Sequence, residues 1–357
     1  MKGIGLVGAV LVLSEAGDRF RGVAGTSAGS IAATLIAALT KAGQPMSRLK
    51  EFMDSMEFSK FMPEGRLHSF LDHEGGKVGS LVADAAILTH RMGLYPGSYL
   101  EEWLSPKLDE LDSATFGDLK LSADDDPGQS LPPGHEYRLV VHVSDVTRAQ
   151  LVQLPWDFPI YGFAPDGMDV VQAVRASMSI PFFFVPVTFQ TQSADVEVPT
   201  PDGRSATQHH EGGTVTWVDG GMLRNFPINA FDRVTGDPRW PTIGIKLSSL
   251  QTRFAPTNAC ENAVAVGVHC LRTMMNEWDA YTVDEQTAGR TIFVDNGGLT
   301  ATDFNLTKEQ QNTLFLNGVG AATQFVIEMS ANHGVPRAGV QAATLIRTRR
   351  TTVAPNI

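Results

Sequence analysis

The fold is decided by the stretch Gly25-Thr26-Ser27-Ala28-Gly29, which fits the pattern G-x-S-x-G. A short apolar segment, residues 22–24, precedes it, and residues 30–41 are rich in Ala, Leu and Ile. The first segment is typical of a brief buried strand, and the second is typical of a helix. The sequence therefore predicts a strand, a sharp turn at the serine and a helix.

A serine between two glycines on such a turn is typical of a hydrolytic nucleophile. Side chains at the flanking positions would collide where the strand reverses into the helix, so glycine suits both. The turn exposes the serine Oγ, and the first N–H groups of the helix lie beside it. Such groups stabilise the negative charge of a tetrahedral intermediate. A plain Gly-Ser turn is the alternative interpretation, and the surrounding strand and helix favour the catalytic one.

Strands and helices alternate along the rest of the chain. Periodicity predicts strands at residues 137–144, 150–154, 215–218, 243–247 and 291–294, and helices at residues 8–16, 99–111, 169–178, 259–278 and 308–330. Residues 190–213 are polar and Gly-rich, and we expect a long excursion between strands there. We expect an α/β fold in one domain, with a mixed, mainly parallel central sheet sandwiched by helices.

An amphipathic block rich in Met and Phe occupies residues 47–110. We expect this insertion to be helical. Its middle part, residues 60–100, is a candidate lid over the site, and ordinary core packing is the alternative interpretation.

The charge balance excludes several classes of partner. The chain has 28 Lys and Arg against 39 Asp and Glu, and this net charge of −11 disfavours DNA, RNA and strongly anionic membranes. Its two cysteines, Cys260 and Cys270, lie too far apart along one predicted helix for a disulfide. No Cys/His cluster suggests zinc. We therefore expect reduced thiols, a cytoplasmic location, no metal and no cofactor.

The N-terminus resembles a signal peptide only superficially. Lys2 precedes the apolar run Gly3–Leu13, but the residues after it do not form a clean cleavage site. No stretch reaches the roughly 18 apolar residues of a membrane span. We expect this run to be the first helix of the fold, and any membrane contact to be peripheral.

A serine hydroxyl needs a base that takes its proton. None of the nine histidines follows a strand in a conspicuous turn, so no histidine of a triad is evident. Asp219 ends a predicted strand, and Gly220-Gly221 after it let the backbone turn sharply. Desolvation raises the pKa of a carboxylate in such a place and makes it a better base. An ordinary Asp-Gly turn is the alternative interpretation.

Together these motifs resemble the patatin-like phospholipase family. The matched segments, in family order, are Lys2-Gly3-Ile4, Gly25-Thr26-Ser27-Ala28-Gly29, Arg175–Phe184, Asp219-Gly220-Gly221 and Leu223–Pro227. The resemblance runs from residue 2 to about residue 330, and the ordered set is far more specific than any single motif.

This resemblance implies a patatin-like three-layer fold for residues 1–330, with residues 331–357 as a C-terminal tail. It implies a Ser27–Asp219 dyad in place of a triad, and hydrolysis of the fatty-acyl esters of lipids or phospholipids through an acyl-enzyme. The residues that it implies for the oxyanion site and its turns are Gly3, Gly25, Ala28, Gly29, Gly220 and Gly221.

One departure from the family pattern bears on activity. Members carry a run of glycines just before the step that matches Lys2-Gly3, and the N–H groups of that run build the oxyanion hole. This sequence begins at Met1 without the run, so we expect either that the natural chain starts earlier or that the hydrolase is impaired, with Ala28 N–H as a partial substitute. Two other functions remain open: an esterase or thioesterase for small soluble esters, and a lipid-binding protein without turnover.

Overall fold

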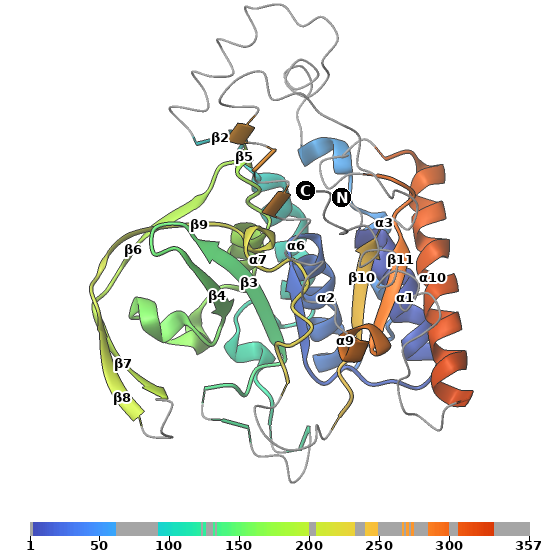
Figure 1. The fold of residues 1–357 in the computed structure, drawn as a ribbon, viewed down its shortest axis with the longest axis horizontal. Coiled ribbons are helices and arrows are strands. Elements are labelled where there is room, and N and C mark those ends of the chain that lie inside the picture. Colours follow the sequence, from blue (N-terminus) through green and yellow to red (C-terminus); the bar gives the residue numbers. More distant parts are fainter. Residues whose placement is uncertain are drawn as a thin grey trace, which may run out of the picture. The chain divides into compact units, whose positions relative to one another are not determined.

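Figure 1 shows the computed structural model of the chain. It describes residues 3–61, 92–122, 124–125, 131–132, 134–199, 205–232, 240–248, 266–267, 269–270, 273–274, 285–299 and 306–331. By its internal contacts the chain divides into two compact units. The first comprises Met1–Phe20, Gln44–Ser55 and Arg224–Ile357, and the second comprises Arg21–Gly43 and Met56–Leu223.

A five-stranded mixed sheet forms the centre of the second unit. Its strands are β1 (Val23–Thr26), β3 (Leu139–Asp145), β4 (Gln150–Leu154), β6 (Val187–Thr191) and β9 (Gly213–Asp219). The order is β1-β3-β9-β6, with β4 also paired to β3. β1 runs parallel to β3, whereas β4 and β9 run antiparallel to β3, and β6 runs antiparallel to β9.

Helices of the second unit pack against this sheet, as the α/β prediction requires. α2 (Ala28–Lys41) contacts β1 and β3, and α7 (Val170–Ser177) contacts β3, β9 and α2. α6 (Ser98–Glu110) packs on α7. α2 presents an almost continuous buried surface of Ile, Leu and Ala, because it lies on the sheet through most of its length.

An aromatic cluster holds β9 on the sheet. The ring of Trp217 lies 4.5 Å from that of Phe189 and 5.1 Å from that of Tyr161, both edge to face. The ring of Phe158 lies 6.2 Å from that of Trp217. These side chains come from three segments of the chain, so the cluster fixes the end of β9 by packing as well as by its ladder.

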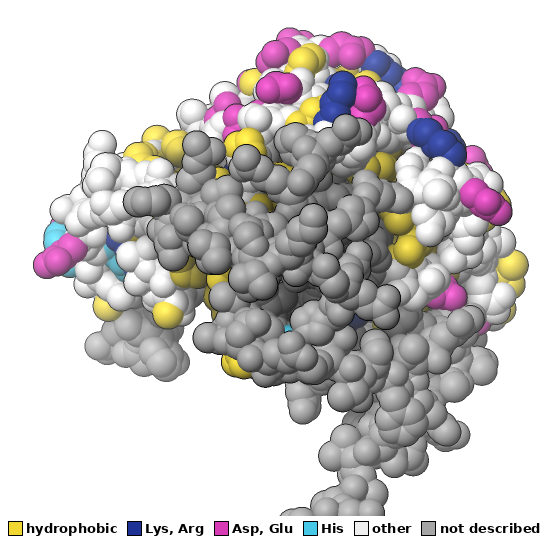
Figure 2. All heavy atoms as spheres, turned by 90° about the horizontal axis from the view of Figure 1, so that it is seen from above, with side chains coloured by type: hydrophobic (Ala, Val, Ile, Leu, Met, Phe, Trp, Pro, Cys, Tyr) yellow, Lys and Arg dark blue, Asp and Glu magenta, His cyan; other side chains and the backbone are white. Residues whose placement is uncertain are grey.

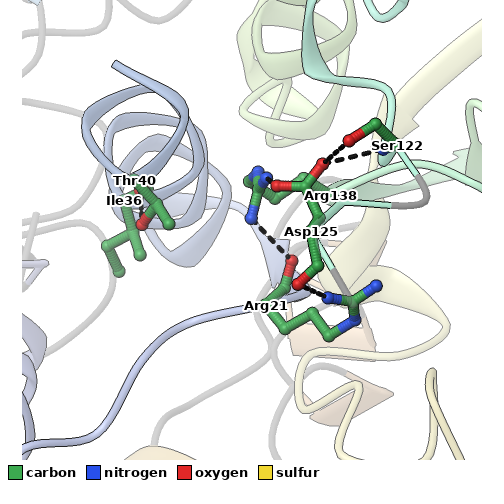
Figure 3. A network of polar contacts seen from close by, with 6 residues as sticks. All are labelled: Arg21, Ile36, Thr40, Ser122, Asp125 and Arg138. Carbon is green, nitrogen blue, oxygen red and sulfur yellow. Dashed lines mark hydrogen bonds and ion pairs between the residues drawn. The ribbon is translucent and has the colours of Figure 1, made fainter. Parts of the chain in front are cut away.

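A polar network lies at the N-terminal ends of β1 and β3 (Figure 3). The guanidinium of Arg138 donates to the carboxylate of Asp125 at 2.5 Å and to the carbonyl of Arg21 at 3.3 Å. The backbone N–H and hydroxyl of Ser122 also donate to Asp125. Burial by itself raises the pKa of Asp125, but these donors outweigh it and lower the pKa, so the carboxylate stays ionised beside Arg138.

Two long helices and a parallel strand pair make up most of the described part of the first unit. Its elements are α1 (Gly3–Glu15), α3 (Arg48–Asp54), β10 (Gly244–Ser248), α9 (Glu285–Gly289), β11 (Thr291–Asp295) and α10 (Lys308–Ala331). The core joins α1, β11 and α10 through Ala9, Leu13, Ile292, Val294, Ala322 and Phe325. α1 is apolar on nearly every side, which explains its resemblance to a signal peptide.

Glycines let the backbones of α1 and α10 approach closely. A Cβ placed on Gly318 would lie 2.0 Å from the carbonyl oxygen of Gly5, and one on Gly8 would lie 2.2 Å from that of Phe315. Real Cβ atoms do not come this close to a backbone oxygen, so larger residues at these positions would push the helices apart.

Most predicted elements are confirmed, with small shifts at their ends. The hairpin of residues 137–154 is β3 and β4, and the predicted helices at residues 169–178 and 308–330 are α7 and α10. The mixed α/β class is confirmed. We expected a mainly parallel sheet, whereas most strand pairs of the five-stranded sheet are antiparallel. In the five-stranded sheet β1–β3 is the one parallel ladder among the described strands.

Residues 190–213 contain the expected excursion between two strands, β6 and β9, and within it β7 (Ala194–Pro199) and β8 (Ser205–His210) form an antiparallel hairpin. One local prediction was wrong. The block at residues 47–110 is not entirely helical, because β2 (Gly93–Tyr95) pairs in parallel with β5 (Phe182–Phe184).

Several other predictions lie outside the described residues. They concern residues 62–91 of the candidate lid at 60–100, most of the helix at 259–278, Cys260 and residues 332–357 of the tail. Cys270 is a free, exposed thiol. No helix of the described residues is long and apolar enough to cross a bilayer. The division into a domain at residues 1–330 and a tail remains a prediction.

The close approach of α1 and α10 predicts opposite effects for two glycines of one helix. We expect Gly318→Ala to lower the free energy of unfolding by about 1–3 kcal/mol, because its methyl group overpacks the contact with Gly5. Gly320 has open space around its Cβ position, so Gly320→Ala is expected to raise that free energy by up to about 1 kcal/mol through helix propensity. Urea unfolding followed by circular dichroism measures both. Equal effects of the two substitutions would contradict the packing argument.

Candidate active site

The turn after β1 holds Ser27 in an uncommon backbone conformation. Its φ of 53° and ψ of −129° lie outside the regions that residues with a Cβ ordinarily adopt. Such a conformation costs about 1–3 kcal/mol and persists only where the surroundings enforce it. Gly25 is part of that enforcement, because a Cβ there would lie 2.2 Å from the carbonyl oxygen of Gly29. Glycine at position 25 lets the first turn of α2 fold back onto β1.

The side chain of Ser27 meets that of Asp219. Ser27 Oγ donates a hydrogen bond of 2.6 Å to Asp219 Oδ2. The other carboxylate oxygen, Oδ1, accepts the backbone N–H of Gly221 at 2.7 Å. Ser27 is half-buried, whereas Asp219 has no exposed surface.

Burial controls the ionisation of Asp219. Desolvation raises the pKa of this carboxyl group to about 7, and the hydrogen bonds from Ser27 and Gly221 lower it only in part. An ordinary aspartate of pKa 3.8 is a very weak base at neutral pH. Asp219 is therefore poised to accept and return a proton near neutral pH.

The sheet brings the two residues together because β1 and β9 share one edge of β3. β4 occupies the other edge along residues 141–145. β1 pairs with the remaining edge as far as Thr26, opposite His142, and β9 runs the other way along that edge to Asp219, opposite Val143. The two strands thus end head to head, opposite neighbouring residues of β3. The residues at their tips, far apart in the sequence, have to meet.

Gly220 lets the chain leave β9 at this crowded point. A Cβ on Gly220 would lie 2.2 Å from the carbonyl oxygen of His142 and 3.0 Å from the methyl group of Thr26. The same turn aims the N–H of Gly221 at the Asp219 carboxylate. The glycines after Asp219 therefore serve the site through close approach and through a backbone donor.

The N-terminus of α2 supplies N–H groups beside Ser27 Oγ. The first N–H groups of a helix have no acceptor within the helix, and Ala28 and Gly29 occupy these positions. The carbonyl of Ser27 is held within the same turn by the N–H of Ser30 at 2.8 Å and by its hydroxyl at 2.6 Å. Ala28 and Gly29 thus offer donors for an oxyanion, reinforced by the positive end of the helix dipole.

The structure brings together most of the residues that the sequence singled out. Gly25, Ser27, Ala28, Gly29, Asp219, Gly220 and Gly221 converge in the second unit. Gly3 starts α1 in the first unit, and its part in an oxyanion site remains a prediction. None of the hydrogen bonds found in the described ranges joins a histidine to Ser27 or Asp219, and no cluster of metal ligands occurs within those ranges.

Sequence reasoning missed one residue that touches the site. Ser177, the last residue of α7, accepts the backbone N–H of Ser27 on its hydroxyl oxygen at 2.9 Å. It lies in the segment Arg175–Phe184, which was noted for family likeness without a role. The two serines in the otherwise apolar stretch 176–180 were the available signal, but only the fold shows which of them faces Ser27.

Comparison with known proteins shows the family of the chain. A family model described as "Patatin-like phospholipase" matches residues 1–232, which include both Ser27 and Asp219. The protein YqhO of Bacillus subtilis (strain 168), whose name describes it as uncharacterized, is 31% identical over 314 residues. The aligned region covers 88% of this chain and 90% of YqhO.

Burial of the Asp219 carboxyl group is expected to lower the free energy of unfolding of the protein above neutral pH. Because the folded state holds the Asp219 proton with a pKa of about 7 against 3.8 for an unperturbed group, stability falls as pH rises between these values. Asp219→Asn keeps the shape and removes the charge. We expect it to raise the free energy of unfolding at pH 8.5 by about 1–4 kcal/mol, with a smaller gain at pH 5.

Asp145→Asn is the matched control. Asp145 is equally buried, but it accepts the N–H groups of Thr147 and Arg148 and the hydroxyl of Tyr161. Loss of these bonds to a carboxylate is expected to cost about 1–3 kcal/mol. Urea unfolding of both variants at two pH values measures the contrast. Destabilisation by Asp219→Asn at pH 8.5 would refute the desolvation argument.

Proposed function

The chain belongs to the patatin-like phospholipase family, and from this premise we propose that it is a serine acyl hydrolase that cleaves fatty-acyl esters of lipids. In this proposal Ser27 is the nucleophile and Asp219 is its base. The single observation that carries it is the 2.6 Å hydrogen bond from Ser27 Oγ to a fully buried carboxylate. A base of pKa about 7 in direct contact with a serine hydroxyl suits proton transfer at neutral pH.

Acylation begins when Asp219 Oδ2 takes the proton of Ser27 and Oγ attacks the ester carbonyl carbon. The carbonyl oxygen becomes an oxyanion, and the N–H groups at the start of α2 stabilise it. Collapse of the intermediate breaks the bond to the leaving alkoxide. Asp219 gives this alkoxide the proton that came from Ser27. The products of this step are an acyl ester on Ser27 and a free alcohol.

Deacylation repeats these steps with water in place of the alcohol. Asp219, again ionised, takes a proton from a water molecule, and the resulting hydroxide attacks the acyl carbon. Collapse releases the fatty acid and returns the proton to Ser27 Oγ. One carboxylate therefore serves both half-reactions, and no histidine is required.

The charge of the protein bears on how it meets a lipid substrate. The net charge is −11, and acidic side chains are more frequent than basic ones on the face shown in Figure 2. Such a surface is repelled by anionic lipid. We therefore include in the proposal a peripheral contact with neutral or zwitterionic lipid rather than with an anionic surface.

The proposed dyad is tested by two substitutions. We expect Ser27→Ala and Asp219→Asn each to lower kcat/KM for a medium-chain fluorogenic ester by at least about 10³-fold, because each removes a partner of the same proton transfer. Thermal unfolding checks that both variants are folded. Asp145→Asn, assayed at a temperature where it is folded, is the control and is expected to keep its activity. Activity that survives in Ser27→Ala sinks the proposal.

The substrate class is tested by varying acyl length and presentation. Lipid hydrolysis predicts higher kcat/KM for long acyl chains and a rise in rate when the ester forms micelles. Activity on short esters alone, indifferent to micelles, favours the small-ester hydrolase. Lipid binding without turnover, unchanged by Ser27→Ala, favours the lipid-binding alternative.

The pKa of Asp219 predicts the pH dependence. The base has to be ionised in the free enzyme, so kcat/KM should rise with pH through about 7 and become constant above it. Initial rates between pH 5 and pH 9, corrected for spontaneous ester hydrolysis, give the profile. A kcat/KM that falls as pH rises through 7 contradicts the role of Asp219 as a base.

A further inference from the structure

We infer that Ser177 is a positioning residue, whose hydroxyl fixes the backbone of Ser27 so that its Oγ stays within reach of Asp219. This inference rests on the proposed function for its catalytic consequence. The structural part, the restraint on the Ser27 amide, stands independently of it.

The hydrogen bonds of Ser177 have one possible direction. The backbone N–H of Ser27 can only donate, so Ser177 Oγ accepts it, at 2.9 Å. The hydroxyl proton of Ser177 is then directed to the carbonyl oxygen of His142, 2.8 Å away, which can only accept. The hydroxyl thereby links the nucleophile to β3. An alanine at this position offers neither partner.

The Ser27 backbone needs this link because of its conformation. Its carbonyl is held locally by the N–H and hydroxyl of Ser30, within the first turn of α2. Its N–H is held by Ser177, 150 residues further along the chain. A residue with φ of 53° relaxes toward ordinary backbone angles when a restraint is lost. Rotation of the peptide before Ser27 would carry Oγ away from Asp219.

Ser177 is itself firmly held. Asp169 caps the start of α7 by accepting the N–H of Gln172 at 3.0 Å. Near the end of α7, the buried guanidinium of Arg175 donates to the carbonyl of Val185 at 2.8 Å and to the carbonyl of Pro96. The helix is therefore fixed at both ends, and the hydroxyl of Ser177 has a defined place.

The same short segment also restrains the base. The carbonyl of Ser179 accepts the backbone N–H of Asp219 at 2.9 Å. Met178 lies between them, with its Sδ 3.9 Å from Ser27 Oγ. Residues 177–179 thus touch the tips of both β1 and β9, which do not pair with each other. This segment therefore holds the backbones of Ser27 and Asp219 at a fixed distance from each other.

The test compares Ser177→Ala with Ser113→Ala. Ser113 has no exposed surface, and its hydroxyl donates to the carbonyl of Leu111 at 2.9 Å, so the two substitutions remove similar groups. Ser113 touches neither Ser27 nor Asp219. We expect Ser177→Ala to lower kcat by about 10–10²-fold with KM nearly unchanged, because misplacement of a reacting atom by about 1 Å costs this much. Ser113→Ala is expected to keep the wild-type kcat.

A second readout does not depend on hydrolysis. We expect the amide proton of Ser27 to exchange with solvent at least about 10-fold faster in Ser177→Ala than in Ser113→Ala, measured by NMR. Ser177→Thr keeps the hydroxyl and, when its unfolding midpoint matches the wild type, is expected to restore both kcat and amide protection.

These readouts separate the inference from the proposed function. Unchanged kcat and unchanged Ser27 protection in Ser177→Ala overturn the inference, and so does a folded Ser177→Thr that behaves like Ser177→Ala. If Ser27→Ala hydrolyses the ester as fast as the wild type, the proposed function fails. The protection of the Ser27 amide then still decides whether Ser177 holds that backbone.

Discussion

A carboxylate without water contact must be satisfied by hydrogen bonds, and the arrangement around Asp219 follows from this constraint. Its two oxygens have two donors, the hydroxyl of Ser27 and the N–H of Gly221. Two donors do not replace the hydration of a charged group, so the pKa rises to about 7. The desolvation that makes the group costly to bury also makes it a useful base. The catalytic proposal and the instability of the site have the same cause.

The sheet is what makes such burial possible at a site that still opens to a substrate. Because β1 and β9 stop head to head on one edge of β3, their tips lie inside the fold while Ser27 keeps partial exposure. Two glycines accommodate the crowding: Gly25 beneath the first turn of α2 and Gly220 against the carbonyl of His142. A side chain at position 25 would push the first turn of α2 away from β1, and one at position 220 would push the end of β9 away from β3. Either change would lengthen the bond between serine and aspartate.

The cost of the site is offset by well-packed elements around it. Trp217 anchors β9 in an aromatic cluster two residues before Asp219. Arg175 joins the end of α7 to the segments at Pro96 and Val185. Strained and desolvated residues persist only where their neighbours are rigid, and here buried packing and hydrogen bonds between segments hold those neighbours in place.

The sequence by itself determined whatever depends on neighbouring residues. The strand, turn and helix around Ser27, the Asp-Gly-Gly step at a strand end, the mixed α/β class and the family all follow from local patterns and their order. The hairpin at residues 194–210 was not predicted, although residues 194–198 alternate between apolar and acidic, because its second strand, Ser205–His210, is mostly polar and lacks such a pattern. β2 escaped because its three residues become a strand only by pairing with β5, almost 90 residues away.

Tertiary structure alone decided which of these pieces meet. No pattern near Ser27 tells that β1 and β9 share an edge of β3, or that Ser177 rather than Ser179 faces the nucleophile. The raised pKa of Asp219 likewise needs complete burial, which the carboxylate acquires only when distant segments close around it. Local sequence sets the conformations that each segment prefers. Desolvation, close approach and hydrogen bonds between segments arise only when the chain has folded, because they depend on distances in space and not on spacing in the sequence.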